Sequence, residues 1–295
     1  MVLPEFDYSV ASTLEEACRL QAQWGASAKV MAGGTDIIPP MKDKVLKADH
    51  IISISRIPGL DTIEYDEKEG LKIGALAKLF DIQTSKLVQK VNPAVAQSAK
   101  YVASTQIRNR GTLVGNICNA SPSCDTGSIL VACNAKVLVQ GVNGTREVPM
   151  DEFFTGVKRT CLKPEEGEIV TAVVIPPLAE DEHAAYLKHA VRKAMDLAIV
   201  GVAAWVKVDG NVIKDARIAL AGVATTILRA TDAEQYLIGK EISDEVLGEA
   251  GVLAMRQCRP ISDVRASAEY RKDMIRVFTK RAVKKAMEGY EEGSI

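Results

Sequence analysis

The sequence predicts an α+β protein of two domains, and three observations support this prediction. The chain has 295 residues, whereas a typical domain has roughly 150. Strand-like and helix-like segments alternate along the first half, and Pro176-Pro177 ends that pattern. Three further strand-like segments then precede a run of helices, which is typical of an α+β domain. We therefore expect a first domain over residues 1–177 and a second over residues 178–295.

The first of two expected subdomains, about residues 1–58, has the pattern of a small β/α unit. A capping box at residues 13–16 predicts the start of a helix that ends at Gly25. Short apolar runs at residues 29–32 and 50–54 predict two strands. We expect these strands to be parallel.

The second expected subdomain, about residues 59–177, is predicted to contain hairpins and helices. Asn143-Gly144 is a strong signal for a hairpin turn. The predicted strands are residues 62–65, 71–74, 136–140, 145–148 and 168–175, and the predicted helices are residues 79–91 and 93–102. Residues 104–125 are expected to form a long polar loop.

The second domain is predicted to combine a three-stranded antiparallel sheet with helices. Asp209-Gly210 predicts the turn between the last two strands. The strands are expected at residues 185–191, 198–208 and 211–221, and the helices at residues 226–237, 244–258 and 266–287.

Charge and hydropathy argue against several functional classes. Lys and Arg total 37 while Asp and Glu total 38, so the net charge of −1 provides no basic excess for nucleic acid or an anionic membrane. No apolar run approaches the roughly 18 residues that a membrane-spanning helix needs. The N-terminus has early acidic residues and does not resemble a signal peptide. We therefore expect a cytoplasmic protein with no membrane insertion and no nucleic-acid partner.

The six cysteines, at positions 18, 118, 124, 133, 161 and 258, show no metal-binding spacing. None forms a C-x-x-C pair, and three histidines add no recognisable zinc set. The C-x4-C-x2-C spacing of plant-type ferredoxins is also absent, so we expect no iron–sulfur cluster on this chain. Scattered cysteines in a reducing compartment usually act as small buried apolar residues.

The first candidate for a binding site is the segment Lys29-Val-Met-Ala-Gly-Gly-Thr-Asp36, in which a strand ends in two glycines. Gly33 and Gly34 permit positive φ and close approach of a ligand, so that N–H groups can form an anion-binding concavity. Thr35 adds a hydroxyl. The pattern suits a phosphate, although a tight strand-to-helix turn would use the same glycines. It is neither a P-loop nor a Rossmann loop, because G-K-[ST] and G-x-G-x-x-G are both missing.

The second candidate segment, residues 105–125, is rich in Gly, Asn, Arg and hydroxyl side chains. Long loops without regular structure are usually functional. Gly111 and Gly115 would let a ligand approach the backbone, and Thr112 and Asn116 could donate hydrogen bonds. This composition suits a polyhydroxylated, phosphorylated ligand. A surface loop held by Asx turns would have a similar composition.

These two segments contain three short motifs: A-G-G-T-D at residues 32–36, Q-I-R-N-R-G-T-x-x-G-N at 106–116, and S-P-x-x-D at 121–125. Further motifs are F-F-x-G-x-x-x-T at 153–160 and L-x-P-x-E at 162–166, and residues 186–192 are similar to F-x-K-x-x-x-R with Tyr at the first position. Together they resemble the FAD-binding subunit of the molybdenum hydroxylases, which include xanthine, carbon monoxide and nicotinate dehydrogenases. One departure is Val114, where the family usually has Gly. A β-branched residue would be strained there if the position required positive φ.

The resemblance implies an FAD-binding domain of the vanillyl-alcohol-oxidase/PCMH type in two subdomains, followed by a C-terminal α+β domain. It implies that residues 29–36 wrap the FAD pyrophosphate and that residues 112–116 form the second wall. Asp125 would bind a sugar or ribityl hydroxyl, and the backbone near Ile169 would meet the adenine or ribose side. Lys188 would lie near the flavin end, where a cation suits reduced flavin; the alternative is a solvated strand residue.

The full set of cofactor contacts implied by the resemblance is Lys29, Val30, Met31, Ala32, Gly33, Gly34, Thr35, Asp36, Ala103, Gly111, Thr112, Leu113, Val114, Gly115, Asn116, Asp125, Ile169 and Lys188. We expect no metal ligand and no catalytic side chain on this chain.

The function implied by the resemblance is electron transfer within a larger complex. Electrons would arrive from 2Fe-2S clusters on a small partner subunit, reduce FAD, and leave to an acceptor such as NAD(P)+. A large molybdopterin subunit would carry out the hydroxylation. Two alternatives stay open: a stand-alone FAD-dependent reductase of the same fold, and a non-catalytic scaffold subunit without FAD.

Overall fold

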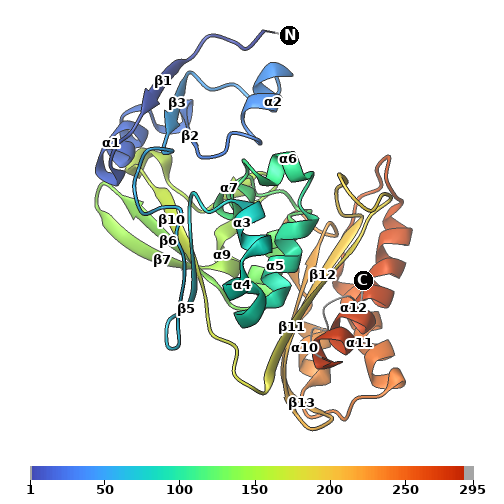
Figure 1. Ribbon diagram of the computed structural model, residues 1–295. Coiled ribbons are helices and arrows are strands. Elements are labelled where there is room, and N and C mark those ends of the chain that lie inside the picture. The colour runs from blue at the N-terminus through green and yellow to red at the C-terminus, as the bar shows by residue number, and fades with distance from the viewer. Residues whose placement is uncertain (1, 289–295) are drawn as a thin grey trace.

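The computed structural model describes residues 2–288, and the chain passes through three larger sheets in succession (Figure 1). Residue 1 and residues 289–295, which are the outer ends of the two predicted domains, lie outside the described residues.

A three-stranded parallel sheet forms the N-terminal lobe. The Thr13 hydroxyl accepts a hydrogen bond from the N–H of Glu16, as the capping box predicts. The Glu16 carboxylate accepts from the N–H of Ser12, one residue before the N-cap. The predicted parallel pairing is confirmed, and β1 is an additional strand. The elements are β1 (Asp7–Val10), α1 (Leu14–Trp24), β2 (Ala28–Met31), α2 (Ile38–Lys42) and β3 (His50–Ser53), with strand order β1-β3-β2.

A five-stranded antiparallel sheet forms the centre, in the order β4-β5-β10-β6-β7. Both predicted hairpins are present, and the last strand of this region, β10, pairs between them because its apolar residues are buried on both faces. The strands are β4 (Ile63–Asp66), β5 (Gly70–Gly74), β6 (Lys136–Gly141), β7 (Gly144–Pro149) and β10 (Ile169–Ile175). Two short strands, β8 (Phe154–Gly156) and β9 (Arg159–Thr160), pair separately.

Short helices lie between the central sheet and the C-terminal sheet (Figure 1). The predicted helix over residues 79–91 is interrupted at Ser85, whose hydroxyl accepts from the N–H of Val88 and starts a second helix. The helices are α3 (Leu79–Thr84), α4 (Lys86–Val91), α5 (Pro93–Tyr101), α8 (Asp125–Ala132) and α9 (Met150–Phe153).

The expectation of a long polar loop over residues 104–125 is wrong. The segment contains α6 (Thr105–Arg108) and α7 (Leu113–Cys118). The hydroxyls of Ser104 and Thr112 accept N–H groups of the first turns and cap these helices. The apolar residues of α7 are buried in the core. Two of the polar residues that suggested a loop, Ser104 and Thr112, are therefore helix caps.

The C-terminal region is an antiparallel sheet whose own helices pack on one face, while the other face meets helices of the first region (Figure 1). The three predicted strands are confirmed, and a short fourth strand is added because residues 228–229 pair with Ala219 and Leu220 instead of starting the predicted helix. The elements are β11 (Glu182–His189), β12 (Val200–Asp209), β13 (Val212–Ala221), β14 (Leu228–Arg229), α10 (Thr231–Leu237), α11 (Asp244–Gln257) and α12 (Ala268–Glu288).

The two predicted domains are in close contact. Helices α5 and α8 of the first pack against β11 and β12 of the second, while α12 packs on the same sheet from the other side. We propose that the boundary falls at residues 176–181, which connect β10 to β11 without regular structure.

Most of the cysteines are core residues, as predicted. Cys18, Cys124, Cys133 and Cys258 are buried. Burial raises the pKa of Cys18 and Cys133 to about 11, and that of Cys124 and Cys258 to about 12. These thiols are therefore protonated and act as small apolar side chains.

These pKa values predict slow alkylation of the four buried cysteines. At pH 8 fewer than roughly one in a thousand of these thiols would be ionised, and only the thiolate reacts. Mass spectrometry after brief iodoacetamide treatment should find them unmodified in the folded protein and modified after unfolding in urea. Labelling of the folded protein at the unfolded rate would contradict this.

The contact between α11 and α12 depends on Gly251, because a Cβ there would overlap the carbonyl oxygen of Arg276. Gly251→Ala should lower the free energy of unfolding by about 1–3 kcal/mol, since the helices must separate. Gly248→Ala is the matched control on the same helix, where a Cβ meets nothing within 4 Å. The control should stabilise the chain by up to about 1 kcal/mol through helix propensity. Urea unfolding of both variants tests this, and equal effects would refute it.

Candidate functional site

The two glycine-containing segments lie directly against each other. A Cβ at Gly33 would overlap the carbonyl oxygen of Arg110, so only glycine permits this approach. From the other side, a Cβ at Gly111 would lie 3.2 Å from the Oγ1 of Thr35. The strand-to-loop connection after β2 and the connection between α6 and α7 therefore share one contact.

A pocket of about 340 Å³ opens beside this contact. Three of its lining residues are cationic, namely Arg56, Lys78 and Arg110, and one is acidic, Asp61. Concave sites with converging cations suit phosphate groups. The remaining lining residues are Ala32, Gly33, Ser55, Ile57, Pro58, Leu76 and Thr112.

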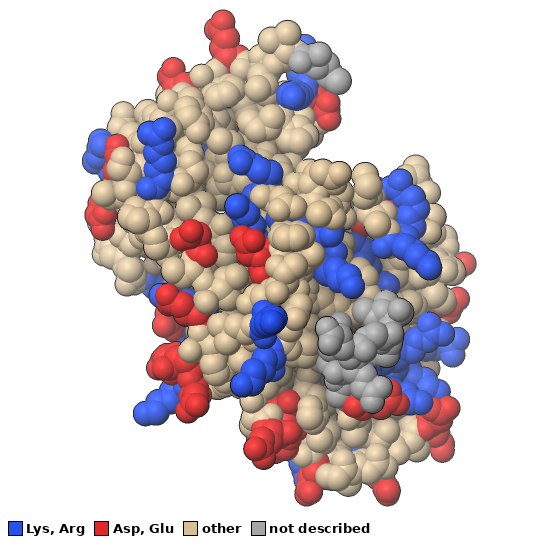
Figure 2. Space-filling model, in the orientation of Figure 1, with Lys and Arg blue, Asp and Glu red and all other residues tan. Residues whose placement is uncertain are grey.

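Arg56 and Lys78 were not predicted from the sequence. They belong to the connections that follow β3 and β5, and neither residue lies in a recognisable motif. An isolated backbone pairing with Thr112 brings Lys78 close to the contact between Gly33 and Gly111. Lys and Arg side chains lie beside Asp and Glu side chains on the face of the molecule that Figure 2 shows.

Thr112 and its neighbours have conformations set by α7. The Thr112 hydroxyl accepts from the N–H of Gly115 at 2.9 Å. Val114 lies in the first turn of α7, so the strain considered for a positive φ does not arise. The side-chain oxygen of Asn116 accepts from the hydroxyl of Thr126 at 2.7 Å, which leaves its NH₂ group as the donor that a ligand would meet.

Asp36 lies at the exposed end of the glycine loop. Neighbouring protein atoms nevertheless desolvate its carboxyl group and raise its pKa, and the charge of Lys158 opposes that shift. Lys158 belongs to the turn between β8 and β9, and its ammonium donates to the side chain of Asn119 at 2.6 Å. The loop after β2 therefore faces the segment that follows α7.

Ala103 is held in a left-handed conformation, with φ of 46°. The guanidinium of Arg108 donates to the carbonyl oxygens of Val102 and Ala103, at 3.0 and 3.2 Å. These bonds offset the backbone strain of a non-glycine residue at positive φ. Ile169 is buried at the start of β10, where it pairs with Gln140.

Asp125 and Lys188 form a buried ion pair. The Nζ of Lys188 donates to the Oδ2 of Asp125 at 2.9 Å, and their side chains are only 6% and 8% exposed, respectively. The same Nζ donates to the carbonyl oxygens of Tyr101 and Asp196, at 3.1 and 2.8 Å. An ammonium has three donors, so all are used within the chain. The alternative of a solvated strand residue is therefore wrong.

Tyr186 is a further member of this cluster and was not predicted from the sequence to be a site residue. Its hydroxyl donates to the Oδ1 of Asp125 at 2.6 Å. Burial and the neighbouring carboxylate raise the pKa of Tyr186 well above its ordinary value, so the phenol keeps its proton. Burial also raises the pKa of Asp125, while the charge of Lys188 opposes that shift.

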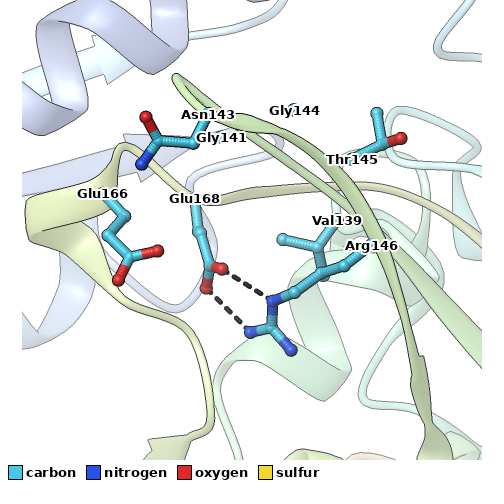
Figure 3. Close-up of a pocket in the computed structure, with 8 residues that line it drawn as sticks. All are labelled: Val139, Gly141, Asn143, Gly144, Thr145, Arg146, Glu166 and Glu168. Carbon is cyan, nitrogen blue, oxygen red and sulfur yellow. Dashed lines mark hydrogen bonds and ion pairs between the residues drawn. The ribbon is translucent and has the colours of Figure 1, made fainter.

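A second, smaller pocket of about 120 Å³ lies beside the β6–β7 hairpin (Figure 3). Its charged centre is a bidentate pair in which Arg146 donates to Glu168 at 2.6 and 2.8 Å. Glu168 also accepts from the N–H of Lys163, and its pKa is lowered chiefly by Arg146. These groups satisfy one another, so we interpret this pocket as structural.

The described residues contain no group of three or more His, Cys, Asp or Glu side chains that could hold a metal ion. Within the same residues, no helix combines the length and apolar character needed to cross a membrane.

Two family models match this chain. Residues 4–178 match the FAD binding domain in molybdopterin dehydrogenase, and residues 185–286 match the CO dehydrogenase flavoprotein C-terminal domain. Together they span almost the whole length that the structure describes.

Individual relatives and solved structures agree with these matches. The chain is 36% identical to the carbon monoxide dehydrogenase medium chain of Hydrogenophaga pseudoflava, over 97% of this chain and 98% of the relative. It is 32% identical to the putative xanthine dehydrogenase FAD-binding subunit of Escherichia coli, over 95% of each. The structure of the H. pseudoflava carbon monoxide dehydrogenase superposes with a TM-score of 0.93, covering 98% of this chain and 99% of that one. The chain therefore belongs to the family of FAD-binding medium subunits of the molybdenum hydroxylases.

Proposed function

We propose that this chain binds FAD between the loop at residues 29–36 and the segment at residues 103–116, and that it transfers electrons through the flavin. The observation that carries this proposal is the glycine contact between the two segments, with a cation-lined pocket beside it. FAD supplies a group that accepts electrons from one partner and passes them to another.

The residues around the pocket fit the two phosphates of FAD. Backbone N–H groups near Gly33 and Gly34 would meet the pyrophosphate. The hydroxyl of Thr112 would donate from the opposite wall. Arg56 and Arg110 would balance the negative charge, since guanidinium groups match phosphate geometry.

The flavin end would lie at the cluster formed by Asp125 and Lys188. Each carboxylate oxygen has a second lone pair in addition to the one used in the chain, so Asp125 can still accept from a ligand hydroxyl. Lys188 would need to release one of its three acceptors to contact the flavin directly. The remaining expected contacts, including Ala103 and Ile169, stay predictions.

The electrons would come from 2Fe-2S clusters on a small partner subunit. The described residues of this chain hold no metal-ligand cluster, and its relatives are named medium chains and subunits of dehydrogenases. A large molybdopterin subunit would perform the hydroxylation, and an external acceptor such as NAD(P)+ would receive the electrons. We place this complex in the cytoplasm.

FAD binding is tested by purifying the chain and identifying any cofactor released by acid. Thr112→Ala should weaken FAD binding about tenfold to thirtyfold, because it removes both the cap of α7 and a phosphate donor, each worth about 1 kcal/mol. Thr112→Ser keeps the hydroxyl and should bind within about threefold of the wild type. Flavin fluorescence titration measures all three proteins.

A folded, colourless chain that takes up no added FAD, alone or with its partner subunits, would refute the flavin proposal and favour a scaffold subunit. Uptake only in the presence of the partners would support binding at a site completed by the complex.

The acceptor is tested by running the reaction backwards. NADH or NADPH should bleach the visible absorbance of FAD bound to the purified complex under anaerobic conditions. Dithionite serves as the control, because it reduces flavin without a nucleotide site. Bleaching by dithionite but by neither nucleotide would overturn the assignment of NAD(P)+ and leave the FAD proposal intact.

A further inference from the structure

Tyr186 places a hydroxyl in the middle of a buried interface. The side chain is 0% exposed and is among the largest that the fold buries completely. A phenylalanine would fill the same space, whereas a buried hydroxyl is costly unless it is hydrogen-bonded. The hydroxyl points to Asp125, a residue that we place in the flavin site. We propose that Tyr186 is a positioning residue that orients Asp125 for FAD.

The geometry of the carboxylate supports this role. Tyr186 and Lys188 are two residues apart on β11, so both side chains lie on one face of the strand. The hydroxyl of Tyr186 donates to the Oδ1 of Asp125 at 2.6 Å, and the Nζ of Lys188 donates to the Oδ2 at 2.9 Å. Two donors from one strand thus fix the plane of the carboxylate. With Lys188 alone, the group could rotate about its remaining contact.

The same contact joins the two halves of the chain. Tyr186 belongs to the C-terminal region, whereas Asp125 begins α8 in the FAD-binding region. A second link lies close by in sequence, where the N–H of Gly222 donates to the carbonyl oxygen of Pro122 at 2.7 Å. The C-terminal region therefore contacts both ends of residues 122–125. This inference rests on the proposed function, because it assigns Asp125 to FAD.

The cluster contains a matched control residue. Tyr101 packs edge-to-face on Tyr186, with ring centroids 6.0 Å apart. Its hydroxyl accepts from the side chain of Gln97 at 3.5 Å instead of donating to Asp125. Tyr101→Phe therefore removes a neighbouring phenol hydroxyl without removing the bond to the carboxylate.

The test compares FAD dissociation constants for the full chain and its variants by fluorescence titration. Tyr186→Phe should raise the constant about tenfold, because a hydrogen bond to a charged group is lost. Tyr101→Phe should stay within about twofold. Tyr186→Phe should also change the visible circular dichroism of the bound flavin, which reports its surroundings, and urea unfolding should show that both variants are folded.

A double-mutant cycle separates positioning from packing. In an Asp125→Asn background, the added Tyr186→Phe should weaken FAD less than about threefold, because the hydroxyl then no longer orients a charged acceptor. The inference would be overturned if Tyr186→Phe changed neither the FAD dissociation constant nor the visible circular dichroism. It would also be overturned if Tyr186→Phe kept its full tenfold effect in the Asp125→Asn background, or if Tyr101→Phe weakened FAD binding as much as Tyr186→Phe does.

Two further outcomes keep this inference distinct from the proposed function. If Tyr186→Phe does not fold, the FAD dissociation constant of Asp125→Asn becomes the test. An unchanged constant for that variant overturns the inference. Failure of the wild-type chain to bind FAD in any state would overturn the proposed function itself.

Discussion

The close approach of Gly33 to the backbone of Arg110 and Gly111 is the constraint on which the site depends. It holds the N-terminal lobe against the segment that leads into α7, and a side chain at Gly33 would force the two apart. The pairing of Lys78 with Thr112 continues the same contact along the central region. The pocket with its three cations exists because these segments, distant in sequence, are held in one place.

Local signals predicted most of the fold, and elements that depend on distant contacts were missed. The capping box at residues 13–16 and the turn at Asn143-Gly144 act within a few residues, so their elements formed as predicted. Helices α6 and α7 were interpreted as loop because they are only four and six residues long and begin with polar caps. Strand β14 depends on pairing with β13, which local propensity does not contain.

In the candidate site, too, residues with a local signal were predicted and residues brought together by distant contacts were missed. Gly33 and Thr112 lie in motifs, because a close backbone approach and a helix cap restrict the residue types that are accepted. Arg56 and Lys78 carry no such restriction, and only the folded chain shows that they converge on one pocket. The resemblance implied both Asp125 and Lys188 but not that they pair, since this contact joins residues from different regions of the chain.

That pairing changes the electrostatic character of the predicted flavin end. A buried ammonium without a partner would be costly, and Asp125 compensates its charge within hydrogen-bonding distance. The cluster therefore presents an ordered set of dipoles with little net charge, and small changes in the orientation of the carboxylate redirect its field. Because Tyr186 and Lys188 both come from β11, that orientation is set by the C-terminal region. The C-terminal region is therefore part of the flavin site that we propose, in addition to packing against the FAD-binding region.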